Sequence, residues 1–553
     1  MSSEDLNEYI VTLKNKEDLD LFYEDMETPG GNLYIPNRSV EVANRRPISR
    51  NTHYYLTKDE AEQLKNDPRV LDVSLTPKQR GVKVVPYGII DGLFDRTEFP
   101  NSSHRNWGLD RCIRGIADSG IGKGSNVRIP ATGKDVDVVI VDGHILVPNH
   151  PEFAKNADGT GGSRVIQYNW FNGSGGNYSY AASIDPGNDD HGTHVAGTAC
   201  GNSQGWASSS NIYNISPYND NPNGDLLMSG AIWDLLREFH LNKPINPNTG
   251  RKNLTVSNHS YGFSKPGYRN DISQIWWRGT KVWQTSGTND IVSKQLLVQY
   301  GIVRYPNNDD LFVHPLRETW IAVDMQDALE DGIIIVAAAG NDYTKIAMPE
   351  DDDYLNRWVD RNNQSFYYHR GSSPGSEWPA ICVGALGIDE YKASFSNYGK
   401  RIDIWAPGVN IQSTVSYPSA TQDYRNSTFY HDKYGGTSMA SPQVAGVLAC
   451  AAELYSKLDK LDTSNPNFDP VSYALYYLWE TATSNQILDT GTNSYSDFFA
   501  FHDSLNFSLF YKKDRPDSGL NWPKVNWWTR PWLSYNAPAG GHQGLIWPRR
   551  KFR

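Results

Sequence analysis

Three short segments of the 553-residue chain hold an aspartate, a histidine and a serine in settings that suit nucleophilic catalysis. Asp142 follows the apolar run VVIV, and open α/β sheets place functional residues at such strand ends. His191 lies in DDHGTHVAGT, at the expected junction of a loop and a helix. Ser438 lies in GGTSMASPQVAG, at the expected start of a helix that tolerates Pro442 in its first turn. Together they are the parts of a catalytic triad.

Each residue type has its own task in such chemistry. A serine hydroxyl is a poor nucleophile until a base removes its proton, and an imidazole can take that proton near neutral pH and return it to the leaving amine. A carboxylate fixes the tautomer of the imidazole and stabilises the imidazolium. Ser438, at a helix N-terminus, would present its own N–H to the developing oxyanion, and Asn341, after the run VAAAG, can supply a second donor.

These residues need a framework, and the stretch 106–460 supplies one. Short apolar runs alternate there with helical stretches. The runs are VDVVIV (136–141), LTVSNHS (254–260), GIIIVAAAG (332–340), AICVGAL (380–386) and IDIWAPG (402–408). Continuous apolar runs of this length are typical of parallel strands covered on both faces. The sequence therefore predicts an α/β fold with a mostly parallel sheet flanked by helices.

Composition and charge exclude several classes of protein. The chain is 38% apolar and 21% charged, which is typical of a globular protein. Its net charge of −11 argues against nucleic-acid binding. The acidic N-terminus does not resemble a signal peptide, and no apolar stretch approaches the roughly 20 residues of a membrane span, so we expect no membrane contact and a cytoplasmic location. Four cysteines without CxxC spacing predict buried free thiols, with one disulfide as the alternative.

In these segments the chain resembles the subtilisin-like serine peptidases, the subtilases. The blocks VVIVDGHILVPNHPEF, HGTHVAGT and GTSMASP match the family's three signature blocks in order, AAAGN matches its oxyanion block, and SNHSYG matches its substrate strand. The resemblance spans roughly residues 106–458. It implies a subtilisin-like core, a triad of Asp142, His191 and Ser438, an oxyanion donor at Asn341, and a serine endopeptidase that requires no cofactor.

The resemblance also implies where a peptide substrate would lie. Two facing segments would line the primary specificity pocket with uncharged residues: Ser260, Tyr261 and Gly262 on one wall, and Ala338, Ala339 and Gly340 on the other. One departure touches the site. The family usually has a hydroxyl residue and then glycine after the aspartate, whereas here Gly143 follows directly and His144 comes next. This puts the hydrogen bonding of the carboxylate in doubt.

Residues 1–76 resemble the inhibitory propeptide of the family. The strand EYIVTL and the capping box of Thr57 and Glu60 predict a small α/β unit. In relatives, such a module assists folding of the core and lays its C-terminal strand in the cleft before cleavage. We therefore expect residues 77–105 to be a linker or cleavage segment, and the chain to process itself or to be autoinhibited by its own module.

Three further regions lie outside this pattern. Within the core, 263–318 is rich in tryptophan and 346–378 in acidic and aromatic residues, and we expect both to be insertions that decorate loops, the first near the cleft. The extension 461–553 is aromatic and basic and could contact assembly partners. These features resemble subtilase-like proteins of tailed phages. They leave a structural or binding protein, for example a virion component with an inactive site, as the alternative function.

Metal binding is the remaining question. His194 is expected to be a packed histidine, because a zinc peptidase helix would read HExxH. His144 and His150 near Asp142 could suggest a metal cluster, but a polar loop is favoured. The acidic runs 309–310 and 350–353 are expected to be solvated faces, with a calcium site in one of these loops as the alternative.

Overall fold

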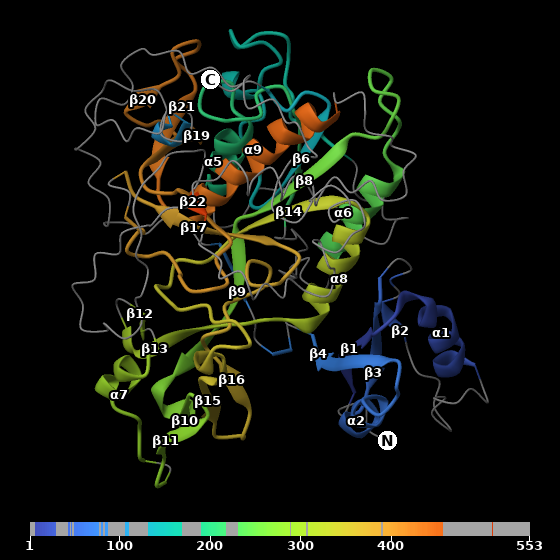
Figure 1. The fold of residues 1–553 in the computed structure, drawn as a ribbon, viewed down its shortest axis with the longest axis vertical. Coiled ribbons are helices and arrows are strands. Elements are labelled where there is room, and N and C mark those ends of the chain that lie inside the picture. Colours follow the sequence, from blue (N-terminus) through green and yellow to red (C-terminus); the bar gives the residue numbers. More distant parts are fainter. Residues whose placement is uncertain are drawn as a thin grey trace, which may run out of the picture.

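The fold is taken from a computed structural model of the chain (Figure 1). The residues that the structure describes are 6–28, 42–44, 46, 49–76, 79–80, 83–86, 106–109, 131–168, 190–216, 231–287, 289–302, 304–305, 308–388, 391–456 and 511–512. The remaining residues, which include Cys112 and nearly all of the predicted extension 461–553, lie outside the described residues.

A mostly parallel sheet forms the centre of the molecule, as the apolar runs predict. Its seven described strands lie in the order β22-β18-β17-β14-β8-β6-β7. They are β6 Val136–Val141, β7 Asn211–Ile215, β8 Leu254–His259, β14 Ile333–Ala338, β17 Ile381–Leu386, β18 Ile404–Pro407 and β22 Tyr511–Lys512. Adjacent strands are parallel except for β18 and β22. Every residue of β6, β14 and β17 is buried, which explains why these runs are so apolar.

Helices cover both faces of this sheet (Figure 1). They are α5 His191–Cys200 and α9 Thr437–Ser456 on one face, and α6 Ala231–Asn242 and α8 Thr319–Glu330 on the other. Val138 belongs to the hydrophobic cluster beneath α5 and α9, whereas Val139 belongs to the cluster beneath α6 and α8. This alternation follows because successive strand residues point to opposite faces. The predicted α/β architecture is confirmed.

The described residues before position 77 form a small α/β unit with its own hydrophobic cluster. Its antiparallel sheet has the order β2-β3-β1-β4. The elements are β1 Asn7–Leu13, α1 Leu19–Glu27, β2 Val42–Asn44, β3 Asn51–Leu56, α2 Lys58–Leu64 and β4 Val70–Leu75. The predicted capping box is present at α2: the Glu60 N–H donates to Thr57 Oγ1 (3.3 Å) and the Thr57 N–H donates to Glu60 Oε2 (2.8 Å).

The segments 263–318 and 346–378, expected to decorate loops, supply most of the strands of two further sheets. The first sheet has the order β12-β13-β9-β5 and the second the order β11-β10-β15-β16. The strands are β5 Lys83–Pro86, β9 Tyr261–Tyr268, β10 Ile272–Trp277, β11 Thr280–Gln284, β12 Arg304–Tyr305, β13 Asn308–Pro315, β15 Arg357–Asp360 and β16 Ser365–Tyr367. A shared cluster that includes Ile275, Phe312, Trp358 and Phe366 holds them together. Phe312, Trp358 and Phe366 are buried in this cluster, whereas Trp276, Trp277 and Trp283 are half-buried.

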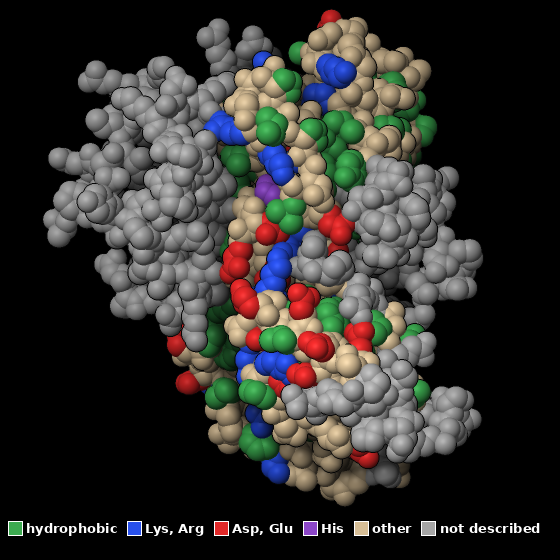
Figure 2. Space-filling view, turned by 90° about the vertical axis from the view of Figure 1, so that its right-hand side faces the viewer, with side chains coloured by type: hydrophobic (Ala, Val, Ile, Leu, Met, Phe, Trp, Pro, Cys, Tyr) green, Lys and Arg blue, Asp and Glu red, His purple; other side chains and the backbone are tan. Residues whose placement is uncertain are grey.

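A third small sheet lies beside α5 and completes the described fold. It consists of β19 Ile411–Val415, β20 Thr421–Gln422 and β21 Tyr430–Tyr434. Cys200, Cys382 and Cys450 are buried free thiols, as predicted. None of the helices in the described ranges has both the length and the apolar character needed to cross a bilayer. On the face shown in Figure 2, Lys and Arg side chains alternate with Asp and Glu.

Candidate active site

Asp142 stands at the carboxyl end of β6 and is 3% exposed. Its backbone N–H donates to the carbonyl oxygen of Ile215, which continues the pairing of β6 with β7. The Gly143 N–H donates to Asp142 Oδ1 at 2.7 Å. The departure from the family pattern at position 143 therefore leaves the carboxylate with a backbone donor in place of a side-chain hydroxyl.

His191 is the first residue of α5 and contacts this carboxylate directly: its Nδ1 lies 2.6 Å from Asp142 Oδ1. The helix can approach because the next residue is Gly192, where a Cβ would lie 2.0 Å from the carbonyl oxygen of Gly143. Thr193 ties the same loop to the helix, since its Oγ1 accepts from the Leu146 N–H (2.9 Å). Nδ1 is therefore held on the carboxylate, and Nε2 is the ring nitrogen turned away from it.

Ser438 lies at the start of α9, beside the end of β8. Its Oγ donates to the carbonyl oxygen of Ser260 (3.1 Å), and Ser260 Oγ donates to the carbonyl oxygen of Ser438 (3.0 Å). Val141 pairs with His259 in the parallel register of β6 and β8, so Asp142 and Ser260 follow neighbouring strand ends. The structure thus brings Asp142, His191 and Ser438 to one edge of the sheet.

Asn341 follows β14 and reaches the same helix start. Its Oδ1 accepts from the N–H of Thr437 (2.9 Å) and from Thr437 Oγ1 (2.9 Å), while the Gly340 N–H donates to Thr437 Oγ1 (3.1 Å). These contacts fix which end of the Asn341 amide faces α9. The anchoring role of Thr437 was not predicted, although its place just before Ser438 in GTSMASP offered a signal.

The two expected substrate walls lie on either side of this helix start. Ala338 and Ala339 are buried, and Asn397 holds the second wall through bonds to the carbonyl oxygens of Ala339 (2.9 Å) and Gly340 (2.9 Å). Gly340 has a φ of 104°, a conformation that favours glycine. On the first wall, the edge of β9 that starts at Tyr261 is occupied by another segment of the same chain.

That segment is β5, from the predicted linker 77–105, which runs antiparallel to β9. Lys83 pairs with Ser264, Val84 with Phe263, Val85 with Gly262 and Pro86 with Tyr261. The chain therefore runs along the first substrate wall towards Ser260, whose carbonyl oxygen is hydrogen-bonded to Ser438. Four residues are too few to show periodicity, so only the resemblance to the family's propeptide indicated a strand in this region.

His194 is a packed histidine, as predicted. It stacks on Tyr434 with ring centroids 4.2 Å apart, and its Nε2 lies 2.9 Å from the carbonyl oxygen of Ile411. Burial lowers the pKa of His194 to about 3, so it is neutral at physiological pH. It therefore adds no positive charge beside His191.

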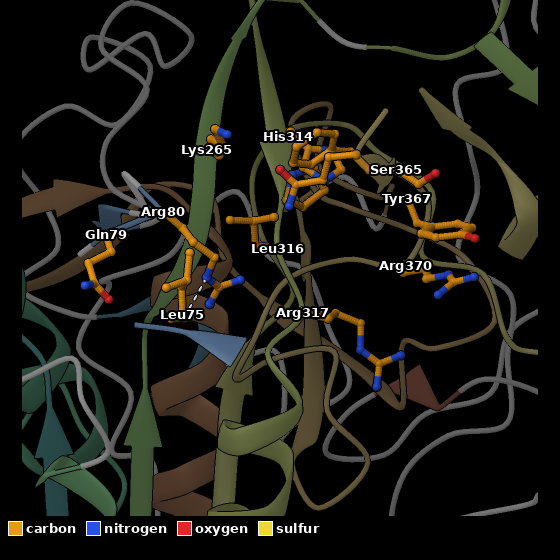
Figure 3. Close-up of a pocket in the computed structure, with 13 residues that line it drawn as sticks. Leu75, Gln79, Arg80, Lys265, His314, Leu316, Arg317, Ser365, Tyr367 and Arg370 are labelled. Carbon is orange, nitrogen blue, oxygen red and sulfur yellow. Dashed lines mark hydrogen bonds between the residues drawn. The ribbon is translucent and has the colours of Figure 1, made fainter. Parts of the chain in front are cut away.

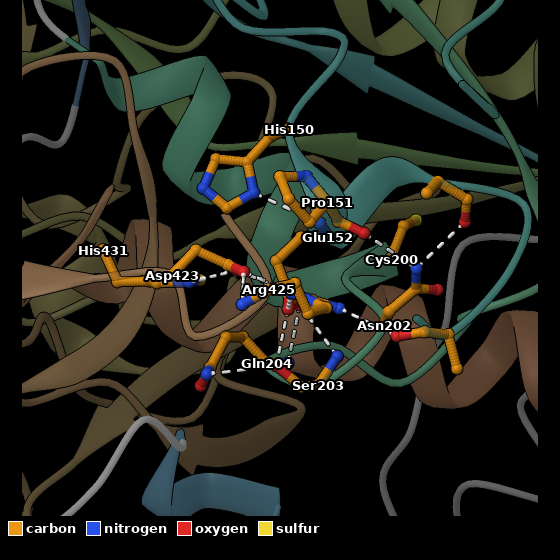
Figure 4. A network of polar contacts seen from close by, with 12 residues as sticks. His150, Pro151, Glu152, Cys200, Asn202, Ser203, Gln204, Asp423, Arg425 and His431 are labelled. Carbon is orange, nitrogen blue, oxygen red and sulfur yellow. Dashed lines mark hydrogen bonds and ion pairs between the residues drawn. The ribbon is translucent and has the colours of Figure 1, made fainter. Parts of the chain in front are cut away.

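A cluster of His150, Asp423 and His431 has the composition of a metal site, with ligand atoms within 4.8 Å of one another (Figure 4). The protein's own groups already engage both ring nitrogens of His150, the Asp423 carboxylate and Nε2 of His431. His150 Nδ1 accepts from the Glu152 N–H (3.1 Å), His431 Nε2 lies 2.9 Å from Asp423 Oδ2, and Arg425 pairs with both Asp423 (2.7 Å) and Glu152. A metal ion at this cluster would have to compete with the Arg425 guanidinium, which already supplies positive charge beside Asp423 and Glu152.

The acidic run 350–353 is not uniformly solvated, which corrects the prediction for Asp353. This residue is 2% exposed and pairs with Arg278 (2.7 Å) and Lys345 (2.5 Å). Burial alone would raise its pKa, but the bonds from Arg278 and Lys345 hold the pKa of Asp353 at about 2. Its charge is neutralised within the protein, and the calcium alternative stays a prediction.

Comparisons with known proteins agree on one family. The model of the subtilase family matches residues 133–492. A subtilisin-like protease of Coccidioides posadasii is 26% identical over 298 residues, which cover 53% of this chain and 43% of that protein. An extracellular serine proteinase of a Thermus species is 34% identical over 170 residues, 31% of each chain. The chain thus spans less than half the length of these two relatives.

Among solved structures, a cold-adapted subtilisin-like serine proteinase is 20% identical. The match covers 74% of this chain and 99% of that one, with a TM-score of 0.40.

Proposed function

The chain belongs to the subtilase family, and from that membership we propose that it is a serine endopeptidase acting through Asp142, His191 and Ser438. The observation that carries this proposal is the 2.6 Å contact of His191 with Asp142 at the same sheet edge as Ser438. Protein or peptide chains are the substrates, and the two uncharged walls favour a neutral side chain next to the cleaved bond.

The proposed reaction follows from the three side chains. Nε2 of His191 takes the proton of Ser438 Oγ as this oxygen attacks a peptide carbonyl carbon, and a tetrahedral oxyanion forms. The imidazolium then gives its proton to the leaving amine, which leaves an acyl-enzyme. In the second half, His191 takes a proton from water as the water oxygen attacks the ester carbon. The bond between that carbon and Ser438 Oγ then breaks, the carboxylic acid product leaves, and His191 returns the proton to Ser438 Oγ. Asp142 holds His191 in the required tautomer through its 2.6 Å contact.

The oxyanion needs donors that are in place before it forms. We assign this role to the N–H of Ser438, at the start of α9, and to the amide NH₂ of Asn341. Anchoring of Asn341 Oδ1 on Thr437 supports the assignment, because a fixed carboxamide costs no reorganisation when charge develops on the substrate oxygen.

We further propose that the N-terminal unit inhibits this site in cis. The register of β5 on β9 supports the proposal, since β5 occupies the edge where a substrate strand would pair. The unit is also docked on α6 and α8. Arg46 is fully buried and pairs with Asp234 (2.7 Å) and Asp324 (2.8 Å), while Arg50 pairs with Asp327 (2.9 Å).

Self-cleavage is the first expected result. Because β5 runs towards Ser260 and ends at Pro86, the scissile bond is expected within the first few residues after Pro86. Intact-mass analysis of the purified wild-type chain should show two fragments that divide there, whereas Ser438→Ala should give one uncut chain. The rate should not depend on protein concentration, because substrate and enzyme are one molecule.

Two outcomes would contradict parts of this proposal. A single 553-residue chain in both proteins would make β5 a permanent part of the fold. Cleavage of the Ser438→Ala chain at the same place would assign the cut to another protease. In either case, the inhibitory role is still tested by whether loss of docking makes amide exchange in β9 faster.

Docking of the module should depend on Arg46. In the Ser438→Ala background, Arg46→Met leaves Asp234 and Asp324 buried without their cation, a loss of about 3–5 kcal/mol. The undocking equilibrium should therefore rise by about 10²- to 5 × 10³-fold, seen as faster amide exchange in β5 and β9. Lys65→Met is the matched control, because Lys65 is an exposed cation of the module that pairs with Glu62 within the module itself. Equal exchange in the two variants would contradict docking through Arg46.

A further inference from the structure

A pocket of about 450 Å³ lies where the end of the N-terminal unit meets the folded insertion (Figure 3). The side chains that carry the argument are Arg80, Lys265, His314, Arg317, Tyr367 and Arg370. Figure 3 shows Arg80 and Lys265 on one side of the pocket and Arg317 and Arg370 on the other. None of the described residues that line it is an aspartate or a glutamate.

The charges of this pocket are only partly balanced. Arg80 pairs with Glu318, and Arg317 pairs with Glu377 at 2.6 Å. Burial lowers the pKa of His314 to about 3, so this residue is neutral. The two remaining cations have no carboxylate partner among the described residues.

These two cations lie against aromatic rings instead. Lys265 Nζ is 5.0 Å from the ring centroid of Phe366, and the guanidinium carbon of Arg370 is 3.4 Å from that of Tyr367. Arg370 also donates from Nε to the carbonyl oxygen of Tyr354 (3.0 Å). The rings hold the cations in place without neutralising them. An anionic group that entered the pocket would meet two preformed positive charges.

The pocket lies beside β9, along the same edge of that strand that pairs with β5. In the antiparallel register, Lys83 is opposite Ser264, so the preceding position of a bound strand would face Lys265. Side chains of directly opposed residues lie on the same face of a sheet. Lys265 is opposite His314 on its other side, and both line the pocket, so the pocket lies on that face.

We propose that this pocket is a distal substrate site, which binds an acidic side chain at the strand position opposite Lys265. The proposal rests on the peptidase function proposed above and names its substrate class: peptides with Asp or Glu at that position, upstream of the cleaved bond. Lys265 forms the cross-strand ion pair, and Arg370 adds the second positive charge.

The chain's own linker contributes Gln79 and Arg80 to the pocket wall but presents no acidic side chain to Lys265. Its sequence before β5 is KQRGV, and the residue that precedes Lys83 is Val82. The linker is basic and has an uncharged valine at position 82, so it gains no ion pair with Lys265 or Arg370. A substrate with an acidic side chain at that position would gain one. Lys265 and Arg370, which stay in place when the linker leaves, thus favour exchange of the cut linker for an acidic substrate.

A charge-reversal cycle on the full chain tests the pairing without any catalysis. In the Ser438→Ala background, Val82→Glu and Val82→Lys are each combined with native Lys265 and with Lys265→Glu. Amide exchange of Val84 and Val85 reports how long the strand stays on β9. With Lys265 present, Val82→Glu should exchange about three- to ten-fold more slowly than Val82→Lys, and Lys265→Glu should reverse the order.

Lys281→Glu is the matched control, since Lys281 is an exposed lysine of β11 outside the pocket, and it should leave the order unchanged. Equal exchange of Val82→Glu and Val82→Lys, or the same order with Lys265→Glu, would overturn the distal site. The cycle needs no peptidase activity, so its failure is distinct from failure of the catalytic proposal, which labelling of Ser438 decides.

Discussion

Ser438→Ala and His191→Ala are each expected to lower kcat by about 10⁶-fold, and the double variant should be little worse than either. The size of this loss is carried over from subtilisin. The reason for its non-additivity is physical: without the base the hydroxyl stays a poor nucleophile, and without the hydroxyl the base has no proton to take. The two residues therefore act as one unit.

Single-turnover self-cleavage and hydrolysis of a peptide by the processed protein both measure this loss. Ser209→Ala is a suitable control, because Ser209 is an exposed serine remote from the sheet edge that carries Asp142. Losses that add fully in the double variant would contradict a shared step. Near-native cleavage by Ser438→Ala would exclude this residue as the nucleophile.

Asn341→Leu is expected to lower kcat by about 10²- to 10³-fold with KM nearly unchanged, since the donor acts on charge that exists only in the transition state. This magnitude also comes from subtilisin, from its corresponding asparagine. Leucine removes the acceptor of the Thr437 N–H as well, so a second variant is needed to separate the two effects.

Asn341→Asp supplies that separation. It keeps an oxygen for the Thr437 N–H and Oγ1 but replaces the NH₂ by a negatively charged oxygen. The variant should keep the fold, as judged by circular dichroism, and should lose at least as much kcat as Asn341→Leu. A large rise in KM with native kcat in both variants would place Asn341 in ground-state binding instead.

The sequence predicts the parallel sheet well because the sheet depends on local patterns, and the resemblance to the subtilases predicts the contact of Asp142 with His191. A buried parallel strand is a continuous apolar run, and residues that follow neighbouring strands meet at one edge. The β6 and β8 bounds agree with the predicted runs to within one residue. The predicted capping box at Thr57 is equally local and is present.

Features that depend on distant partners could not be predicted in this way. The partner of β5 is β9, far along the chain, and nothing local marks Arg46 for burial between Asp234 and Asp324. Asp353 belongs to an acidic run that looks solvated, yet Arg278 and Lys345 neutralise it after folding. Charge pairing across elements appears only when the elements are packed.

Reaction with a fluorophosphonate probe tests most directly whether this protein is a serine peptidase. The probe forms a covalent bond only with a serine that an adjacent base activates, so the wild-type chain should be labelled at Ser438, with stronger labelling once the N-terminal unit is released by Arg46→Met. Ser438→Ala should abolish labelling, and His191→Ala should nearly abolish it. No labelling of wild type or of Arg46→Met, in protein shown by circular dichroism to be folded, would contradict the proposed activity.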